Sequence, residues 1–364
     1  MKRIFIISLI LLVGAILLIF PLIRDEKGSI EEDKREPAVF LFNGPLAVIG
    51  EEEVTIGISV NSNEIDRLQL IYNDSVLNSW LNPRGELSFT YALGKHGIGA
   101  KYLSLRSTLN SGKTVVESRI TRVLSDITPE RKKVRILATV PHNDSNYTQG
   151  LEFYNGVLYE GTGDEGNKGS TRLGKVDLKT GMYGQKVGLS RPYFGEGITI
   201  MNGVVYQLTW RNAKCFVYDS EELQIQSEFN YNGEGWGLCN DGTHLIMSDG
   251  TERITFRDPK TFQILRTIEV YNNTMPITNL NELEYINGKI YANIYLSDGV
   301  VAIDPQTGKV LEEIDASELT RLVLPQLEAG EVLNGIAYNE TNNSIYMTGK
   351  NWPSMFQVEF VKTY

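Results

Sequence analysis

The chain has 364 residues, of which 41% are hydrophobic and 22% are charged, a composition typical of globular proteins with a sizeable core. This length predicts two to three domains. The formal net charge of −10 argues against a nucleic acid or an anionic membrane surface as the main partner, because both would repel an acidic protein.

The first element is an apolar run at residues 4–23, interrupted only by Ser8 and preceded by Lys2 and Arg3. At 1.5 Å per residue, about 20 residues cover the roughly 30 Å hydrocarbon layer of a bilayer. We therefore predict a transmembrane signal-anchor at residues 1–24, with a cytoplasmic N-terminus and the rest of the chain in the periplasm or at the cell surface. A cleaved signal peptide is the alternative, but no small-x-small cleavage site follows the run.

A charged linker is predicted at residues 25–37, because this stretch is dense in charge and poor in apolar side chains. From residue 38 the pattern changes to the alternation that is typical of strands. The predicted strands lie at residues 38–42, 54–60, 67–72, 87–93, 100–107 and 114–124. They indicate a small immunoglobulin-like β-sandwich at residues 38–125, which we interpret as a spacer or docking module. A second linker is expected at residues 126–133.

Residues 134–364 contain a repeat of turns and alternating strands. Its turn dipeptides are Asn155-Gly156, Asn202-Gly203, Asp241-Gly242, Asn287-Gly288 and Asn342-Asn343. Asn-Gly suits a type I′ hairpin, because both central residues of that turn need positive φ. A period of roughly 40 to 50 residues built only from strands and turns is typical of propeller blades. We therefore predict an all-β chain with a five-bladed β-propeller at residues 134–364, in which a strand at 134–140 pairs with the last blade and closes the ring.

The first strand of each propeller blade lines the central channel. The residue before each motif glycine should then lie near the axis, which places Glu196 at one mouth of the channel. Packing does not explain a carboxylate flanked by glycines, and burying it unpaired would be costly. Glu282 matches Glu196 by repeat position, so a structural role is expected for one of the two.

Residue types that bind metals or act as nucleophiles are sparse. The three histidines, His96, His142 and His244, have no neighbours at metal-ligand spacing, so we expect no zinc site and no cofactor. No serine lies in a nucleophile-elbow pattern, and no glycine loop is suited to phosphate. Cys215 and Cys239 fall in different blades, where they form either a disulfide or two isolated buried thiols.

What remains is a carboxylate with aromatic and amide side chains from other repeats. The group is Glu196, Gln149, Trp210, Trp236, Asn281, Tyr295, Asn334, Lys350 and Trp352. Structural alternatives exist for most of them. The aromatic residues can pack between blades, Gln149 and Asn334 can hydrogen-bond neighbouring blades across the axis, and Lys350 can pair with a nearby carboxylate.

Seven motifs, in order along the repeat region, resemble those of one family. They are Tyr147-Thr148-Gln149-Gly150-Leu151, Phe194-Gly195-Glu196-Gly197, Glu234-Gly235-Trp236-Gly237-Leu238, Ser248-Asp249-Gly250-Thr251, Leu280-Asn281-Glu282-Leu283-Glu284, Leu333-Asn334-Gly335-Ile336-Ala337 and Thr348-Gly349-Lys350-Asn351-Trp352-Pro353. In these motifs the chain is similar to the plant and bacterial type of glutaminyl-peptide cyclotransferase, which is known as a five-bladed propeller. Every blade is represented, whereas the first 130 residues lie outside the resemblance.

The resemblance implies that an N-terminal glutamine of a peptide or protein is converted into pyroglutamate, with release of ammonia and without a metal. By motif, Glu196 is similar to the family's catalytic acid/base. The positions that line the substrate pocket are Gln149, Phe194, Trp210, Trp236, Asn281, Tyr295 and Lys350. Tyr147 stands where the family usually has Phe, and Tyr295 where a third Trp is usual. Both keep an aromatic face, so we expect a changed substrate preference rather than a loss of activity. We expect the enzyme to be a monomer.

A single carboxyl group suits this chemistry. The substrate's own α-amine is the nucleophile, and its pKa near 8 leaves an appreciable neutral fraction at neutral pH. The harder step is expulsion of the amide nitrogen, which needs a proton, and Glu196 is expected to carry it from the amine to that nitrogen. The rival hypothesis is a non-catalytic propeller that binds a small ligand or a peptide terminus. Another amide transferase or hydrolase is disfavoured, because no nucleophile or metal site is evident.

Overall fold

A computed structural model describes residues 36–163, 171–327 and 329–363. Within these ranges the chain is all-β, as predicted, and its few helical elements include α1 (Ser317–Val323) and the 3-10 helices η1 (Leu93–His96) and η3 (Leu324–Gln326). The predicted membrane segment, residues 1–24, lies outside the described ranges. No helix inside those ranges has both the length and the apolar character needed to cross a membrane.

Residues 38–124 form two sheets that share a core. Their strands are β1 (Ala38–Phe40), β2 (Leu46–Ile49), β3 (Glu53–Val60), β4 (Ile65–Tyr72), β5 (Ser75–Leu81), β6 (Gly85–Ala92), β7 (Gly99–Leu109) and β8 (Thr114–Leu124). One sheet has the order β1-β3-β6 and the other the order β2-β8-β7-β4-β5. Ile56 and Ile58 of the first sheet and Leu68 and Leu70 of the second belong to one hydrophobic cluster. The sequence pattern does not predict β2 and β5; none of the residues of β5 is buried, so the alternation that marks a half-buried strand is absent.

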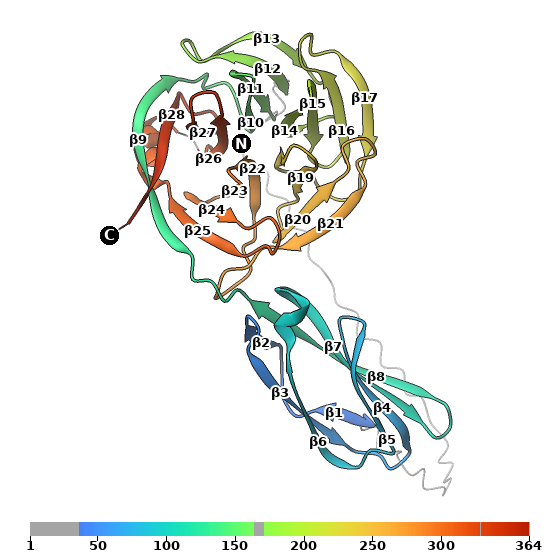
Figure 1. The fold of residues 1–364 in the computed structure, drawn as a ribbon. Coiled ribbons are helices and arrows are strands. Elements are labelled where there is room, and N and C mark those ends of the chain that lie inside the picture. Colours follow the sequence, from blue (N-terminus) through green and yellow to red (C-terminus); the bar gives the residue numbers. More distant parts are fainter. Residues whose placement is uncertain (1–35, 164–170, 328, 364) are drawn as a thin grey trace, which may run out of the picture. The chain divides into compact units, whose positions relative to one another are not determined.

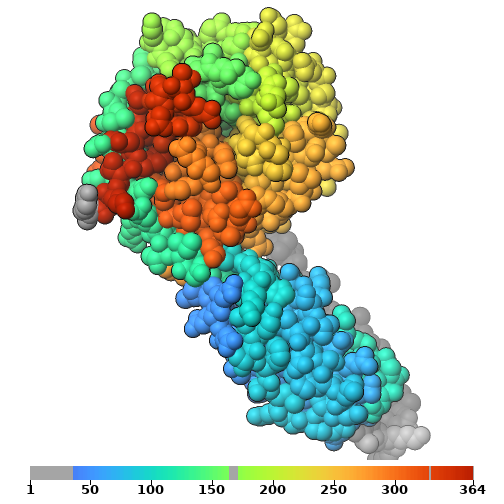
Figure 2. Space-filling model, in the orientation of Figure 1, coloured from blue at the N-terminus to red at the C-terminus, as the bar shows by residue number. Residues whose placement is uncertain are grey.

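The rest of the chain forms consecutive four-stranded antiparallel groups. The first two groups are β10 (Thr148–Tyr154), β11 (Val157–Thr162), β12 (Arg172–Asp177) and β13 (Met182–Gly188), then β14 (Gly195–Met201), β15 (Val204–Thr209), β16 (Lys214–Asp219) and β17 (Ile225–Asn230). The next two are β18 (Leu238–Asn240), β19 (Leu245–Ser248), β20 (Arg253–Arg257) and β21 (Ile264–Glu269), then β22 (Leu280–Ile286), β23 (Lys289–Ile294), β24 (Gly299–Ile303) and β25 (Val310–Asp315). In Figure 1 these groups follow one another around a ring, and Figure 2 shows them packed side by side, coloured from green to red.

The last group joins the two ends of the ring. It contains β26 (Leu333–Asn339), β27 (Ser344–Gly349) and β28 (Ser354–Lys362), and β9 (Glu130–Pro141) pairs with β28 in antiparallel register. This confirms the prediction that the strand before the first repeat pairs with the last one. The strand begins earlier than predicted, because residues 130–133 also pair with β25 in parallel register. Four residues of the predicted linker therefore belong to the sheet.

The first strand of every group lies on the inside of the ring. β10 packs against both β14 and β26, and β18 and β22 complete the circle of neighbouring strands. The side chains of these inner strands are almost all buried. Such close packing needs glycine: a Cβ on Gly197 would lie 2.6 Å from the carbonyl oxygen of Trp236, and one on Gly237 would lie 1.9 Å from that of Asn281.

The hairpin turns are of two kinds. Both residues of Asn155-Gly156, Asn202-Gly203 and Asn287-Gly288 have positive φ, as the type I′ prediction requires. At Asp241-Gly242 and Asn342-Asn343 only the second residue does, because these hairpins close through longer loops, with Asn240 paired to Leu245 and Asn339 to Ser344. The turn dipeptides are therefore not at equivalent positions in all repeats.

The last group also contains a helical segment that the strand-and-turn pattern does not predict. In α1, Leu319 and Val323 are buried in the same hydrophobic cluster as Trp352. Trp352 itself is fully buried, and its indole nitrogen donates to the carbonyl oxygen of Glu331. Trp352 is therefore a core residue, as the structural alternative for the aromatic residues describes.

Candidate active site

The predicted site residues lie where the inner strands begin, at irregularities of their pairing. In β14 the regular register is interrupted between Gly195 and Ile198, in β22 between Leu280 and Leu283, and in β26 between Leu333 and Ile336. β10 has a shorter irregularity at Gln149. Bulges of this kind re-aim side chains and are frequent beside active sites.

The pairing also corrects the expected match between Glu196 and Glu282. Each of the three longer irregularities contains two residues: Glu196 and Gly197 in β14, and Asn281 and Glu282 in β22. Asn281 is therefore the counterpart of Glu196, and Glu282 occupies the place of Gly197. The match predicted from the sequence is therefore wrong by one residue.

Glu196 is buried, with 5% of its surface exposed. Its carboxylate accepts a hydrogen bond of 3.2 Å from Nε2 of Gln149. Burial raises the pKa of Glu196 well above its usual range; the positive charge of Lys350 acts against this rise, and the negative charge of Glu234 adds to it. A buried carboxyl group whose pKa is raised beside a buried cation is suited to acid/base chemistry.

Lys350 connects Glu196 to the aromatic residues. Its Nζ donates to Oε1 of Gln149 at 2.8 Å, and lies 4.8 Å from the ring centroid of Tyr147 and 5.0 Å from that of Tyr295. A cation at this distance from an aromatic face is stabilised by the ring quadrupole. Gln149 thus bridges a buried cation and a buried carboxyl group, which fixes the orientation of its amide.

The aromatic residues form two groups of ring contacts. Phe194 lies against Trp210, with ring centroids 5.7 Å apart, and against Tyr147 at 6.3 Å. On the other side Trp236 meets Tyr295 edge to face at 5.5 Å. We call the set formed by Gln149, Phe194, Glu196, Trp210, Trp236, Tyr295 and Lys350 the Glu196 cluster.

Glu234 joins the two tryptophans and was not among the predicted site residues. Its Oε2 accepts from Nε1 of Trp210 at 2.8 Å and from Nε1 of Trp236 at 3.0 Å, and Oε1 accepts from Arg211. Burial opposes ionisation of Glu234, but the hydrogen bonds from Trp236, Trp210 and Arg211 outweigh it and keep its pKa below the usual value. The need of two indole N–H groups for an acceptor is the signal that could have identified it.

Asn281 and Asn334 have different surroundings. Asn281 is 2% exposed, and its Oδ1 has no hydrogen-bond partner among the described residues. Asn334 donates through Nδ2 to the carbonyl oxygen of Thr148 at 3.0 Å and to Oε1 of Gln149 at 3.4 Å. Asn334 thus makes the contacts between neighbouring repeats that the structural alternative describes, whereas Asn281 has a buried acceptor to offer.

Glu282 stabilises the ring. Its Oε1 accepts from the backbone N–H of Leu151 at 3.2 Å, and its Oε2 from that of Ile336 at 2.9 Å. These donors belong to β10 and β26, so one carboxylate satisfies amides on two neighbouring inner strands. Burial raises the pKa of Glu282, and both backbone hydrogen bonds act against that rise.

Cys215 and Cys239 are both free and buried, as the isolated-thiol alternative describes. No group of three or more His, Cys, Asp and Glu side chains that could hold a metal ion occurs within the described ranges.

Comparisons with known proteins agree with the motifs. The glutamine cyclotransferase family matches residues 109–360. Glutaminyl-peptide cyclotransferase of Arabidopsis thaliana is 36% identical over 237 residues, which cover 64% of this chain and 73% of the relative. The crystal structure of Myxococcus xanthus glutaminyl cyclase superimposes with a TM-score of 0.62 at 37% identity, covering 65% of this chain and all of the other. The chain therefore belongs to the glutamine cyclotransferase family of enzymes.

Proposed function

We propose that this enzyme cyclises the N-terminal glutamine of peptides and proteins to pyroglutamate, with Glu196 as general base and then general acid and without a metal. The observation that supports it most is the environment of Glu196: a buried carboxyl group hydrogen-bonded by Gln149, whose amide oxygen accepts from Lys350 beside the rings of Tyr147 and Tyr295, in a chain of this family. The family membership supports the overall reaction, and the role of Glu196 is our inference.

The reaction needs one proton carrier. The neutral α-amine of the substrate attacks the side-chain amide carbon, forming the C–N bond of the five-membered ring. Ionised Glu196 takes the proton that the amine loses, and returns it to the amide nitrogen. The bond from the carbon to this nitrogen then breaks, and ammonia leaves. A positioned carboxyl group of this kind contributes typically 10²–10⁴-fold to the rate.

The neighbouring residues have separate roles in the proposal. The aromatic side chains of Trp210, Trp236 and Tyr295 hold the glutamine side chain folded, which removes much of the entropic barrier to ring closure. The unpartnered Oδ1 of Asn281 accepts from the attacking amine. Lys350 stabilises the developing oxyanion, either directly or through Gln149, whose Oε1 it holds.

We further propose a five-bladed propeller made of the five strand groups, with an immunoglobulin-like sandwich before it. In this proposal residues 1–24 anchor the chain in a membrane and residues 25–37 link it to the sandwich, so that the enzyme acts outside the cytoplasm. Fractionation of cells that express the full chain tests the anchor. Recovery of the intact chain in the aqueous fraction would refute it.

The activity is tested with the full chain and a short glutamine-initiated peptide in the presence of a chelator, by following ammonia release. An N-acetylated copy of the peptide is the matched control, because its blocked nitrogen cannot attack. We expect ammonia from the free peptide alone. A folded protein that releases none would contradict the proposal and favour a binding function, whereas activity that disappears only with the chelator would contradict metal independence.

A further inference from the structure

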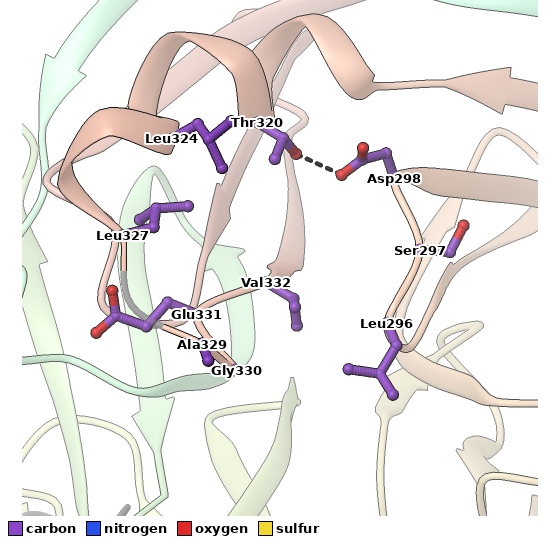
Figure 3. A pocket seen from close by; sticks show the side chains of 10 residues that line it. All are labelled: Leu296, Ser297, Asp298, Thr320, Leu324, Leu327, Ala329, Gly330, Glu331 and Val332. Carbon is purple, nitrogen blue, oxygen red and sulfur yellow. Dashed lines mark hydrogen bonds between the residues drawn. The ribbon is translucent and has the colours of Figure 1, made fainter.

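A cavity of about 410 Å³ lies between the loop after β23 and the segment that follows α1. Figure 3 shows its two walls. Leu296, Ser297 and Asp298 form one side, and Leu324, Leu327 and Val332 form the other.

Both walls continue into the Glu196 cluster. On one side Leu296 directly follows Tyr295. On the other, the backbone N–H of Lys350 donates to the carbonyl oxygen of Val332 at 2.9 Å. Nζ of Lys350 lies 5.0 Å from the ring centroid of Tyr295. The residues that adjoin the two walls are therefore in contact within the Glu196 cluster. The cavity therefore lies next to the proposed active site.

The lining of the cavity is mainly aliphatic. Leu296 is 67% exposed and Leu324 is 58% exposed, and Figure 3 shows Leu324 and Val332 bordering the space. The polar side chains are engaged with other groups: Thr320 donates to Asp298 across one end. Glu331 accepts from Nδ2 of Asn351 at 3.0 Å, and its carboxylate is directed away from the space. An apolar group entering the cavity would bury aliphatic surface without leaving a polar partner unpaired.

Leu296 has an unfavourable backbone conformation. Its φ is +62°, in the left-handed region that is unfavourable for a residue with a Cβ. Strained and exposed apolar residues are unusual in loops unless the surrounding structure or a ligand makes use of them. The strain holds a leucine side chain in water beside the site.

We propose that this cavity binds an apolar side chain at the second position of the substrate, immediately after the N-terminal glutamine. The inference rests on the proposed function, because it requires the glutamine to occupy the Glu196 cluster. Consecutive Cα atoms are about 3.8 Å apart, so the second residue must lie next to the cluster, and the cavity is adjacent on its Tyr295 and Lys350 side. The bound side chain replaces water over Leu296, Leu324 and Val332.

The test compares kcat/KM for the peptides Gln-Leu-Gly-Gly and Gln-Ala-Gly-Gly, using the full chain and ammonia release. We expect the leucine peptide to be preferred by about ten-fold, as is typical for a few methylene groups in an apolar site. In Leu296→Asn this preference should fall to about one. Asparagine tolerates the left-handed conformation, so the loop keeps its shape. Leu265→Asn is the matched control, because Leu265 is a 55% exposed leucine on β21, and it should keep the ten-fold preference.

Three outcomes would overturn the inference. Equal values for the two peptides with the wild-type chain would show that the cavity does not recognise the second residue, while the proposed function would stand. A preference that survives in Leu296→Asn would assign it to another surface. Absence of ammonia from every peptide would remove the proposed function and this inference together.

Discussion

The bulges at the start of β14 and β22 contain the same residue type one position apart. β14 has Glu196 first and Gly197 second, whereas β22 has Asn281 first and Glu282 second. Glu196 accepts a side-chain hydrogen bond from Gln149, and Glu282 accepts two backbone hydrogen bonds from neighbouring strands. Burial raises the pKa of both carboxyl groups.

Raised pKa values therefore do not distinguish a reactive carboxyl group from a structural one in this protein. The partners do. The backbone amides that bind Glu282 cannot rearrange without moving β10 or β26, so that carboxylate is committed to the fold. Glu196 is hydrogen-bonded by a side chain instead of by the backbone, and the unpartnered Oδ1 of Asn281 belongs to the same ring of inner strands. The position of each glutamate within its bulge therefore determines whether its carboxylate is available for chemistry.

The largest expected effect is on turnover in Glu196→Gln. The substitution keeps the shape and removes the proton carrier, so kcat should fall by about 10²–10⁴-fold, measured as ammonia release from a glutamine-initiated peptide. Glu282→Gln is the matched control and should keep kcat within about three-fold. Equal losses of kcat in the two variants would contradict the different roles assigned to Glu196 and Glu282.

Glu282→Leu should mainly affect stability. It leaves the N–H groups of Leu151 and Ile336 without an acceptor, at a cost of about 1–3 kcal/mol each. We expect the free energy of unfolding, measured in urea, to fall by about 2–5 kcal/mol. Glu282→Gln retains one acceptor oxygen and should lose about half as much. An unchanged unfolding midpoint in Glu282→Leu would argue against this structural role.

Glu234 sharpens the comparison, because it supports the aromatic residues without reaching the reacting atoms. In Glu234→Leu the indoles of Trp210 and Trp236 lose their shared acceptor, and kcat/KM should fall about ten-fold as their positions loosen. Glu234→Gln keeps an acceptor oxygen and should restore most of the activity and the tryptophan fluorescence spectrum. If glutamine fails as badly as leucine, the charge of Glu234 is required and not its hydrogen bonds.

A smaller effect is expected in the pH profile of Lys350→Met. The charge of Lys350 lowers the pKa of Glu196, so its removal should raise that pKa further. Glu196 must be ionised to accept a proton, and the acidic limb of kcat/KM should therefore move to higher pH. The limb of the substrate amine, near 8, should not move. Lys260→Met, at an exposed lysine outside the Glu196 cluster, is the control; a limb that moves equally in both variants would contradict the assignment.

Much of the fold and of the site is predictable from the sequence. Alternating strands and Asn-Gly turns predicted the all-β chain and the pairing of the first strand with the last repeat. Motif residues predicted Gln149, Glu196 and Lys350, and the structure places them in one hydrogen-bonded series.

The remainder depends on contacts that a linear pattern does not contain. Equivalence of Glu196 with Asn281 depends on the strand register around the two bulges. Glu234 can be assigned to the site only from the three-dimensional structure, in which it accepts hydrogen bonds from both Trp210 and Trp236. Helix α1 is held by the burial of Leu319 and Val323, a spacing too short to indicate a helix by itself.

The most direct test measures activity and stability together in Glu196→Gln and Glu282→Gln. A buried carboxyl group with a raised pKa contributes stability at low pH that is lost as pH rises through that pKa. Glu196→Gln should therefore be inactive and, as pH rises, at least as stable as the wild type, because a neutral amide carries no charge whose burial opposes folding. Glu282→Gln should be active and less stable, because it removes one of the two oxygens that accept from the backbone N–H groups of Leu151 and Ile336. An active Glu196→Gln would contradict the proposed mechanism, because no other group in that mechanism carries the proton.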